Sequence, residues 1–367
     1  MPRAPLPILA LLGALCCSAM AWPAMAGTEA ETTPPAPAAA AAPPTTAAPT
    51  TERTLAGHAR FDLQRPEIVA FVAHMSTVGF TPEETNAVLA TAEPQPKIID
   101  AMNRPAEKSL AWWEYRARFL TPERIDAGAR LWREHRELFD AIAMERHVEP
   151  QYVLGILGVE TYFGRLQGRY RVLDALATLG FDYPARGEYF RRELEQFLLL
   201  TRNGELDPQA TLGSYAGAMG AAQFMPSSFQ HFAVDQDDSG RRDLWGDWAD
   251  IFGSVANYLQ QHGWEYGQPV LADAELGTAT APTPAASVTL DTTLGALRQR
   301  GMQVTSTLDA ATPCVVIPAA LSSGMSYRVG FRNFYVITRY NHSPMYAMAV
   351  NDLAQAIAAR VLAPDAP

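Results

Sequence analysis

The sequence predicts a mainly α-helical protein of the α+β class, in which a small β domain is inserted into a helical core. Helix-start signals support this class, because Thr81 and Thr121 each precede a Pro-Glu pair and Pro150 opens an apolar stretch. The pattern changes between about residues 267 and 330, where short runs of β-branched residues alternate with Gly, Pro, Thr and Ser clusters. Helical signals then return toward the end of the chain.

The composition limits the classes of protein to which this chain can belong. The chain has 367 residues, 48% of them hydrophobic, which is enough to bury a sizeable core and suits two or three domains. Its formal net charge of -10 excludes a broad nucleic-acid surface, since neutralising phosphates requires clustered Lys and Arg. We therefore expect a globular protein that binds no nucleic acid.

Residues 1–26 have the pattern of a secretory signal peptide. An Arg near the start precedes an apolar stretch at 6–15, and small residues end in an A-x-A triplet at 24–26. Three prolines leave too short an uninterrupted stretch for a membrane-spanning helix, which is the competing interpretation. We expect cleavage and export to the periplasm. Lipid attachment at Cys16 or Cys17 is a less favoured alternative, because neither follows the small residue that attachment usually needs.

Residues 27–55 are mostly Ala, Pro and Thr with almost no large apolar side chain, so we expect a disordered tether. Cleavage would leave Cys314 as the only cysteine, which excludes an intrachain disulfide and favours a small buried hydrophobe at that position. The folded segments that we expect are a helical domain (56–145), the core with a calcium-type loop (146–266), the small β domain (267–330) and a return to the core (331–367).

Individual elements can be predicted inside these segments. Large apolar side chains share one stripe of an amphipathic helix around 188–200. Aromatic and β-branched residues dominate three short runs, 287–290, 315–317 and 334–337, which we expect to be strands of the small sheet. The Ala- and Leu-rich segment 343–362 returns to a helical pattern.

Glu160 is the candidate catalytic acid. It follows Val153, Ile156 and Leu157 on an apolar helical stripe. Burial disfavours the charged carboxylate, and Gly164 as the expected helix C-cap places the side chain near the negative end of the dipole, so both effects should raise its pKa. A carboxylic acid that stays protonated near neutral pH suits a general acid, for example in cleaving a glycosidic bond.

Two further clusters combine small, polar and aromatic residues. In 213–228, glycines and alanines allow a ligand to approach the backbone, while Ser214 and Gln223 can hydrogen-bond to hydroxyl or N-acetyl groups. In 339–346, Tyr and Asn supply the stacking and amide hydrogen bonds that suit sugar rings. Each cluster has a non-catalytic alternative. The candidate acid could pair with Arg165, the small residues could serve tight helix packing, and the last cluster could be a plain aromatic turn.

Four motifs occur in an order that matches a known family: Val159-Glu160-Thr161-Tyr162-Phe163-Gly164, the segment from Gly213 to Ser228, Gly253-Ser254-Val255-Ala256-Asn257-Tyr258, and Tyr340-Asn341-x-Ser343-x-x-Tyr346. Together they resemble the soluble and membrane-bound lytic murein transglycosylase B family, the family 3 peptidoglycan lytic transglycosylases. The resemblance runs from about residue 61 to 362. It implies a lysozyme-like helical core, with a helical domain and a small β domain, that acts on the glycan strands of bacterial peptidoglycan.

The resemblance also implies roles for particular residues. Glu160 matches the family's catalytic acid/base. Arg186 lies where the family tends to place adjacent arginines for the peptide stem, but Ala185 stands beside it, which leaves the stem-peptide preference open. The residues that match the family's saccharide groove are Tyr115, Ser214, Gln223, Tyr340, Asn341 and Tyr346.

One carboxylate is enough for this chemistry if the substrate supplies the other groups. Glycosidases ordinarily use two carboxylates, whereas the three clusters contain only one. The N-acetyl group can stabilise the oxocarbenium ion, and the muramic acid 6-hydroxyl can attack the same carbon, with Glu160 acting first as acid and then as base. We therefore predict cleavage of the β-1,4 bond between N-acetylmuramic acid and N-acetylglucosamine, with 1,6-anhydromuramyl ends as products.

This chemistry needs no cofactor, and we expect a monomer whose partner is the glycan strand. A peptidoglycan hydrolase that uses water, a muramidase, is one alternative, and a non-catalytic glycan-binding cell-wall protein is the other. The sequence leaves endo- or exo-action open.

An acidic segment has the start of a calcium-binding loop. Asp235, Asp237 and Ser239 offer oxygens at positions 1, 3 and 5, Gly follows at position 6, and the carbonyl of Arg241 could serve at position 7. Position 12 lacks the expected Glu. The resembling family implies a late carboxylate here, for which Asp250 is the best match. We expect a structural Ca²⁺, with an acidic, solvated turn as the alternative.

Overall fold

The computed structural model describes residues 60–103, 110–282 and 288–362. The predicted signal peptide (1–26) and tether (27–55) lie outside these described residues. Among the helices that the structure describes, none is both long enough and apolar enough to cross a membrane.

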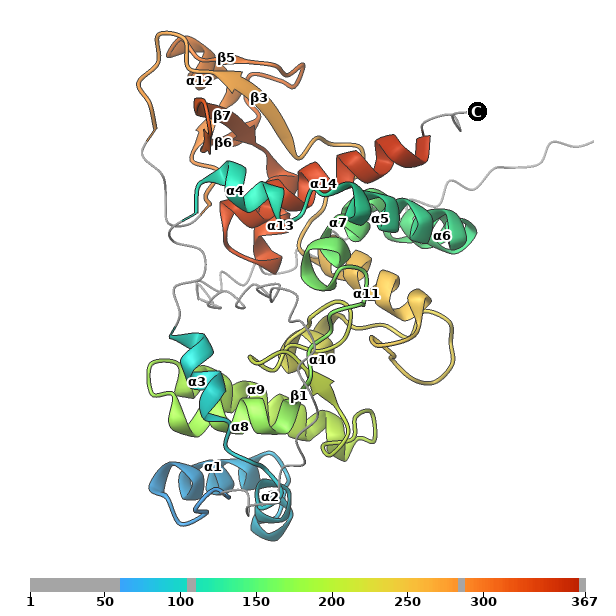
Figure 1. The fold of residues 1–367 in the computed structure, drawn as a ribbon, viewed down its shortest axis with the longest axis vertical. Helices are drawn as coiled ribbons and strands as arrows, with labels where there is room; N and C mark the ends of the chain where they lie inside the picture. The colour runs from blue at the N-terminus through green and yellow to red at the C-terminus, as the bar shows by residue number, and fades with distance from the viewer. Residues whose placement is uncertain (1–59, 104–109, 283–287, 363–367) are drawn as a thin grey trace, which may run out of the picture. The chain divides into compact units, whose positions relative to one another are not determined.

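One packed group of helices surrounds α7 and α14 (Figure 1). Its members are α4 (Trp112–Ala117), α5 (Pro122–Glu134), α6 (Arg136–Arg146), α7 (Pro150–Thr161), α11 (Trp248–Gln261) and α14 (Pro344–Leu362). Thr121 caps α5 by accepting a hydrogen bond from the N–H of Arg124, and Pro150 is the first residue of α7. Both helix starts were predicted, and α14 confirms the helix expected at 343–362.

Helix α7 is buried on almost every side, rather than along one stripe. The side chains of Val153, Ile156 and Leu157 are fully buried, and the residues on its other faces between Tyr152 and Val159 are buried as well. A helix that is apolar all round belongs in the centre of a core. The apolar stripe in the sequence therefore predicted a helix buried along one face, whereas the structure buries its other faces as well.

Two glycines allow α14 to pack closely against α7. A Cβ atom on Gly155 would lie 2.7 Å from the carbonyl oxygen of Val350, and one on Gly158 would lie 2.7 Å from Cδ2 of Leu353. A spacing of three residues puts both glycines on one face of the helix. Their missing side chains therefore set the distance between the two helices.

A second packed group contains α1 (Pro66–Thr77), α2 (Pro82–Leu89), α3 (Pro96–Met102), α8 (Val172–Asp182) and α9 (Gly187–Arg202). The ring of Phe181 packs edge-on against Phe61 and Phe71, with ring centres 5.9 and 5.7 Å away. Arg65 forms an ion pair with Asp182 at 2.6 Å. Helices α1 and α3 thus pack on α8, and α2 packs on α1. Helix α9 packs on α8 and confirms the amphipathic helix expected around 188–200.

The β region forms a five-stranded antiparallel sheet with the strand order β4-β6-β7-β3-β5. The strands are β3 (Leu271–Glu275), β4 (Thr292–Thr293), β5 (Gln303–Val304), β6 (Pro313–Leu321) and β7 (Gly324–Gly330), with α12 (Leu294–Gln299) between β4 and β5. Cys314 on β6 lies in a small apolar cluster with Leu297 and Phe331. Burial raises the pKa of this thiol to about 11, which fits the buried hydrophobe that was predicted.

Two of the three predicted strands are wrong. Residues 334–337 lie inside helix α13 (Arg332–Tyr340), and the described residues 288–290 are irregular. Phe334 and Ile337 are fully buried and three positions apart, so they share a helix face. A short aromatic and β-branched run cannot be distinguished from a buried helical segment by periodicity alone. The run at 315–317 lies within β6, as predicted.

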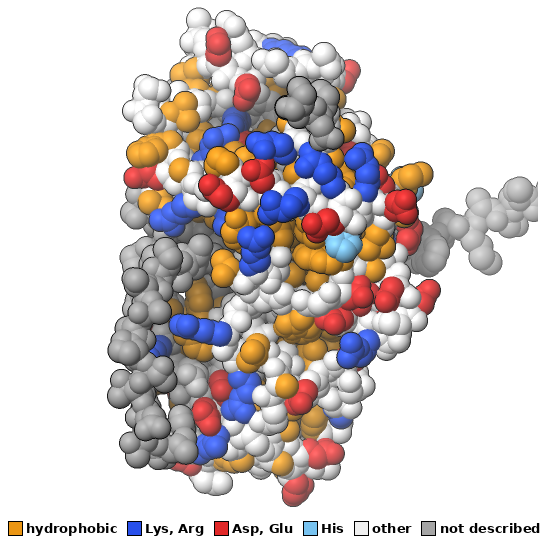
Figure 2. Space-filling model, turned by 45° about the vertical axis from the view of Figure 1, so that its right-hand side comes forward, with side chains coloured by type: hydrophobic (Ala, Val, Ile, Leu, Met, Phe, Trp, Pro, Cys, Tyr) orange, Lys and Arg blue, Asp and Glu red, His pale blue; other side chains and the backbone are white. Residues whose placement is uncertain are grey.

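The elements confirm a mainly α architecture with a small sheet, completed by α10 (Pro226–Phe232) and the two-stranded pair β1 (Tyr170–Arg171) and β2 (Leu212–Gly213). The interval 56–145 contributes helices to both packed groups, and its assignment as one domain stays a prediction. Basic and acidic side chains both occur on the face shown in Figure 2.

Replacing Gly155 by Ala should destabilise the protein, because the added methyl group would meet the backbone oxygen of Val350. Overpacking costs about 1–3 kcal/mol, and the better helix propensity of Ala offsets about 1 kcal/mol of it. Urea denaturation measures the difference in unfolding free energy. The control is Gly246→Ala at an exposed position where the nearest atom lies 3.6 Å away, which should change stability by less than about 0.5 kcal/mol. Equal loss in both variants would contradict the packing role of Gly155.

Candidate active site

Glu160 lies in the last turn of α7, where the buried helix reaches partial exposure. Its Oε1 atom accepts a hydrogen bond of 2.6 Å from the phenol of Tyr346, which lies in the first turn of α14 and is only 1% exposed. The close packing of the two helices therefore brings together two side chains that are 186 positions apart in the sequence. A donated hydrogen bond favours the charged carboxylate, so this contact opposes the effect of burial that was expected from the sequence.

Tyr340 is the second phenol of the cluster. Its hydroxyl donates a hydrogen bond of 2.5 Å to the carbonyl oxygen of Ala222. Burial, and then the negative charge of Glu160, raise the pKa values of Tyr340 and Tyr346 well above the usual value. Both phenols therefore stay protonated near neutral pH, and they remain hydrogen-bond donors.

The turn after α7 has an unusual backbone. Tyr162, Phe163 and Gly164 have φ angles of 53°, 57° and 75°, so three consecutive residues lie in the left-handed region. Tyr162, rather than the predicted Gly164, caps the helix. Left-handed residues other than Gly are strained, and such strain persists only where surrounding contacts hold it. The hydroxyl of Thr161 supplies such contacts: it accepts from the N–H of Gly164 at 2.9 Å and donates to the carbonyl of Ala221 at 2.8 Å.

Arg165, which was the alternative partner predicted for Glu160, lies against this turn. The guanidinium carbon of Arg165 is 4.8 Å from the centre of the Tyr162 ring, and that of Arg124 is 4.7 Å from the same centre. Arg165 thus stacks on an aromatic ring. One contact of the Glu160 carboxylate comes from a neutral phenol, that of Tyr346.

The segment 213–228 uses several of its polar groups to hold its own conformation. The hydroxyl of Ser214 accepts hydrogen bonds from the N–H groups of Ala216 and Ala218, and the amide of Gln223 donates to the carbonyl of Gly220 at 2.9 Å. A Cβ atom on Gly220 would lie 2.4 Å from the carbonyl oxygen of Leu244. The packing alternative therefore describes part of this segment. Contact of Ser214 and Gln223 with a sugar stays a prediction.

Asn341 and Tyr115 lie close to the two phenols in different ways. Asn341 is 5% exposed, directly follows Tyr340, and accepts a hydrogen bond of 3.0 Å from the N–H of Ser343 just before α14. Tyr115 on α4 is 1% exposed and near enough to Tyr346 to contribute to its raised pKa. The structure thus brings Glu160, Tyr115, Tyr340, Asn341 and Tyr346 into one cluster.

Arg186 lies on another element, at the start of α9. Its guanidinium stacks over Tyr189 and Phe190, with 4.8 and 5.0 Å to the ring centres. Its Nε and Nη2 atoms are buried and find no hydrogen-bond partner within the described residues. The predicted contact of Arg186 with an acidic stem peptide stays a prediction.

Sequence reasoning assigned no role to Thr161 or Tyr258. The phenol of Tyr258 on α11 donates a hydrogen bond of 2.7 Å to the carbonyl of Arg339, and its ring centre lies 4.7 Å from that of Tyr340. Both residues belong to motifs that carried the family resemblance. Their positions inside those motifs were the available signal, but their roles depend on contacts between distant segments.

The acidic loop gathers the predicted ligands. Carboxylate oxygens of Asp235, Asp237 and Asp250 lie within 4.8 Å of one another, and the hydroxyl of Ser239 is 3.2 Å from the carbonyl oxygen of Arg241. Burial raises the pKa of Asp250, whereas hydrogen bonds from Ser239 lower that of Asp237. Three oxygen ligands so close together repel one another unless a cation compensates them, and oxygen is the ligand that Ca²⁺ prefers.

The chain matches the family described as Transglycosylase SLT domain over residues 64–355. It is 38% identical to the membrane-bound lytic murein transglycosylase B of Escherichia coli over 289 residues, which are 76% of this chain and 79% of that protein. Its fold resembles the soluble lytic transglycosylase SltB1 from Pseudomonas aeruginosa, with a TM-score of 0.75 and 44% identity over 80% of this chain and 99% of that chain.

A structure of the Escherichia coli lytic transglycosylase Slt35 in complex with calcium is also similar. The TM-score is 0.75 and the identity 36%, over 83% of this chain and 97% of that chain. These similarities confirm the predicted family and the mainly α, lysozyme-like fold.

Replacing Thr161 by Val should destabilise the site. The variant keeps the shape of the side chain but leaves the partly buried N–H of Gly164 and the buried carbonyl of Ala221 without this partner. Unsatisfied buried groups cost about 1–3 kcal/mol. Thr85→Val is the matched control, because Thr85 is equally buried and its hydroxyl bonds only a carbonyl of its own helix start. Urea denaturation should show the larger loss for Thr161→Val, and an equal or smaller loss would contradict its role in holding the turn.

Proposed function

Because the chain belongs to the Transglycosylase SLT domain family, we propose that Glu160 is the single acid/base with which it cleaves peptidoglycan. The chain is a peptidoglycan-cleaving lytic transglycosylase, as its family and its relatives named lytic transglycosylases establish. The proposal therefore concerns which residue performs the chemistry and how it does so.

The observation that carries this proposal is the contact between Glu160 and Tyr346. A carboxyl group at the partly exposed end of a buried helix is held at 2.6 Å by a phenol that stays protonated. This hydrogen bond fixes the orientation of the carboxyl group, and residue 160 is partly exposed. The other side chains that we place in this cluster, all within the described residues, are Tyr115, Tyr340 and Asn341, and none of them is a second carboxylate.

A cluster with one carboxylate favours a mechanism in which the substrate supplies the nucleophile. Glu160 gives its proton to the glycosidic oxygen as the bond from C1 of the muramyl residue breaks, and the N-acetyl oxygen stabilises the developing positive charge. The muramyl 6-hydroxyl then attacks C1 and returns its proton to Glu160. The products are a 1,6-anhydromuramyl end and a free 4-hydroxyl, and no water is consumed.

The residues that match the family's saccharide groove complete the proposed site. Tyr115, Tyr340 and Asn341 would contact the sugars beside Glu160, and Ser214 and Gln223 would line the groove from the segment they stabilise. Arg186 would contact the acidic stem peptide. Two of its buried guanidinium nitrogens have no hydrogen-bond partner among the described residues.

We propose that the acidic loop binds a structural Ca²⁺ through Asp235, Asp237, Asp250, the Ser239 hydroxyl and the Arg241 carbonyl. The similar Slt35 structure contains calcium. The ion would neutralise the three clustered carboxylates and tie the loop to the first turn of α11, where Asp250 lies. It would take no part in bond cleavage.

We place the enzyme outside the cytoplasm, where its substrate is. The Escherichia coli relative is membrane-bound by its name, and the chain begins with the pattern of an export signal. Release into the periplasm by signal cleavage is the form that we propose, and lipid attachment is the alternative.

Glu160→Gln should abolish cleavage of purified sacculi, lowering the rate by orders of magnitude while leaving the melting temperature nearly unchanged, because Gln keeps the shape but carries no transferable proton. Mass spectrometry of the released muropeptides should show 1,6-anhydromuramyl ends for the unmodified enzyme. Reducing muramic acid ends, heavier by one water, would replace the proposed mechanism with hydrolysis. Glu193→Gln, which alters another buried Glu that bonds Ser227 on α10, is the matched control and should retain anhydro products.

Removing calcium should lower the melting temperature, and adding it back should restore the original value. The carboxylate of Asp250 must be deprotonated to bind the ion, and burial raises its pKa, so the stabilisation by calcium should weaken as the pH falls. Asp250→Asn should lose the response to calcium. Asp238→Asn removes a charge from the same loop at a residue outside the three clustered carboxylates, so it should keep the response. If the melting temperature of the unmodified protein did not change when calcium was removed or added, the proposed calcium site would be excluded.

A further inference from the structure

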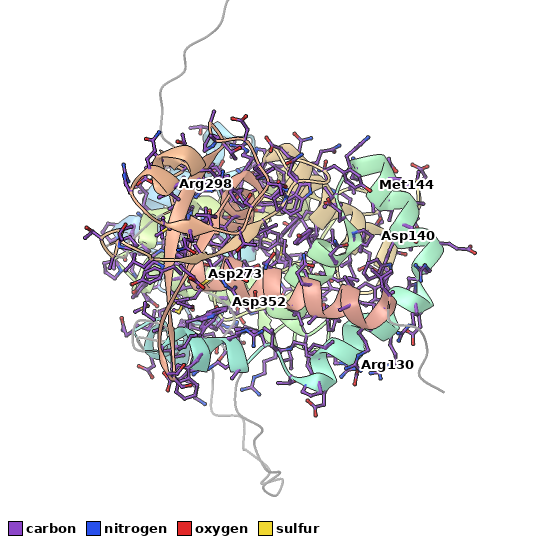
Figure 3. The ribbon with its side chains drawn as sticks, turned by 90° about the horizontal axis from the view of Figure 1, so that it is seen from above. Arg130, Asp140, Met144, Asp273, Arg298 and Asp352 are labelled. Atoms are coloured by element: carbon purple, nitrogen blue, oxygen red, sulfur yellow. The ribbon has the colours of Figure 1, made fainter. Side chains whose placement is uncertain are left out.

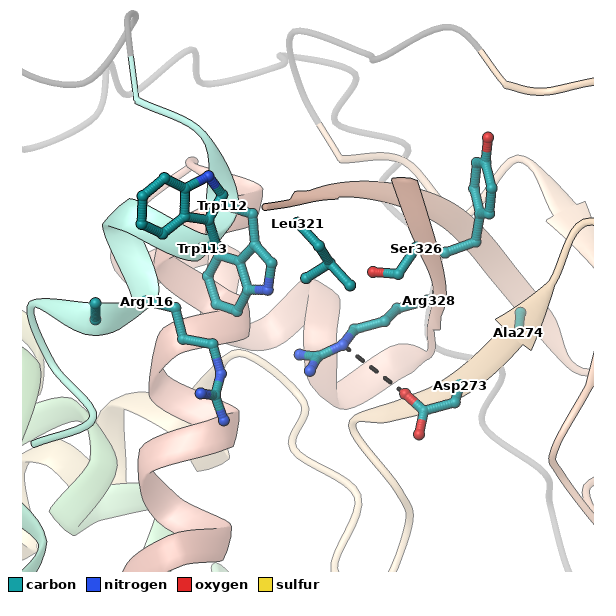
Figure 4. A pocket seen from close by; sticks show the side chains of 10 residues that line it. Trp112, Trp113, Arg116, Asp273, Ala274, Leu321, Ser326 and Arg328 are labelled. Atoms are coloured by element: carbon teal, nitrogen blue, oxygen red, sulfur yellow. Dashed lines mark ion pairs between the residues drawn. The ribbon is translucent and has the colours of Figure 1, made fainter. Parts of the chain in front are cut away.

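A second pocket, of about 430 Å³, opens between α4 and the sheet (Figure 4). Helix α4 and the strands β3, β6 and β7 each contribute side chains to it. The ones that matter here are Trp113, Arg116, Asp273, Leu321, Ser326 and Arg328. None of them belongs to the cluster around Glu160.

Helix α4 presents different residues to the two sites. Tyr115 is 1% exposed and lies beside Tyr346, whereas Trp113 is 45% exposed and lines the pocket. Two positions along a helix turn the side chain by about 200°, so these two residues point to opposite sides of α4. Arg116 follows Trp113 by three positions and lies on the same side. Leaving the indole of Trp113 exposed to water contributes no hydrophobic free energy to folding.

The charges of the pocket balance one another. Its two carboxylates are those of Asp352 on α14 and Asp273 on β3, both labelled in Figure 3. Asp352 accepts from Nε of Arg116 at 2.8 Å and from Nη1 of Arg328 at 2.7 Å. Nε of Arg328 lies 3.9 Å from Asp273, the ion pair that is dashed in Figure 4. Two guanidinium groups therefore face two carboxylates. The Asp352 side chain is only 7% exposed, so these ion pairs hold the arginines in fixed orientations. A balanced pocket does not select a strongly anionic ligand such as a peptide with free carboxylates.

An exposed indole beside fixed planar polar groups suits a neutral ring with one apolar face and many hydroxyls. The indole can stack on the C–H face of a sugar, while free guanidinium N–H groups and the Asp273 carboxylate, whose side chain is 89% exposed, can bond its hydroxyls. We propose that this pocket binds a saccharide unit of the glycan strand at a second site, separate from the cleavage site. The inference rests on the proposed function, because that function supplies the polymer.

A second site changes how tightly a long strand is held without changing the chemistry. When one strand occupies both sites, the second contact is intramolecular, and the combined affinity exceeds that of either site alone. The pocket would therefore matter for intact sacculi, and much less for fragments too short to reach both sites. Helix α4 connects the two sites, since it contributes a residue to each.

Binding can be tested apart from cleavage in the Glu160→Gln background, by co-sedimentation with purified sacculi. Adding Trp113→Ala should weaken binding about tenfold, because the stacking surface is lost. Asp273→Ala, at a highly exposed side chain, should weaken it less. Tyr266→Ala is the matched control, since Tyr266 is also an exposed aromatic residue, 56% exposed, and lies outside the pocket; it should bind like the parent. Melting temperatures check that each variant is folded.

Two outcomes would overturn the proposal. One is that Trp113→Ala binds sacculi as tightly as the parent, or no more weakly than the Tyr266 control. The other is that its binding defect disappears on sacculi stripped of stem peptides by an amidase, which would show that the pocket binds peptide rather than sugar. If the proposed function were wrong, the unmodified enzyme would release no 1,6-anhydromuramyl products. The comparison of sacculus binding between the Trp113 and Tyr266 variants does not depend on that result.

Discussion

The hydrogen bond between Glu160 and Tyr346 depends on how closely α7 and α14 pack. Gly155 and Gly158 remove the side chains that would keep the helices apart, so the first turn of α14 reaches the last turn of α7. Most residues of α7 are fully buried, whereas Glu160 near its end is partly exposed. The carboxyl position is thus a consequence of backbone approach at two glycines, one and a half turns or less from the acid.

The turn that follows the acid stores strain that the neighbouring segment must balance. Three left-handed residues in succession are unfavourable for Tyr162 and Phe163, and the hydroxyl of Thr161 ties them to Ala221 in the 213–228 segment. The same segment supplies the carbonyl of Ala222 that holds Tyr340. One loop therefore supports both the acid's turn and the second phenol, which explains why its own polar groups are largely occupied in holding its shape.

Local patterns in the sequence predicted what depends on local physics. The Thr caps and the first-turn Pro predicted the helix starts correctly, and the apolar run before Glu160 predicted a buried helix that ends near this residue. Residues 334–337 were misassigned because a buried helix and a buried strand look alike over four residues. The contact between Tyr346 and Glu160 and the pairing of Asp352 with two arginines join segments more than 20 positions apart, and periodicity carries no information about such distances. The prediction that Tyr340 and Tyr346 belong to the site came from the family motifs, not from periodicity.

The hydrogen bond that Glu160 accepts from Tyr346 comes from a neutral donor, which bears on the proposed role of Glu160 as acid and base. If Arg165 paired with the acid, a fixed positive charge would hold it ionised and remove the proton that bond cleavage needs. The structure stacks that arginine on Tyr162 instead and gives the carboxyl a phenol whose own pKa is raised well above its usual value. A neutral phenol stabilises the charged form of a carboxyl group far less than a cation does. The carboxyl group that we propose to act first as acid and then as base must be able to exist in both forms.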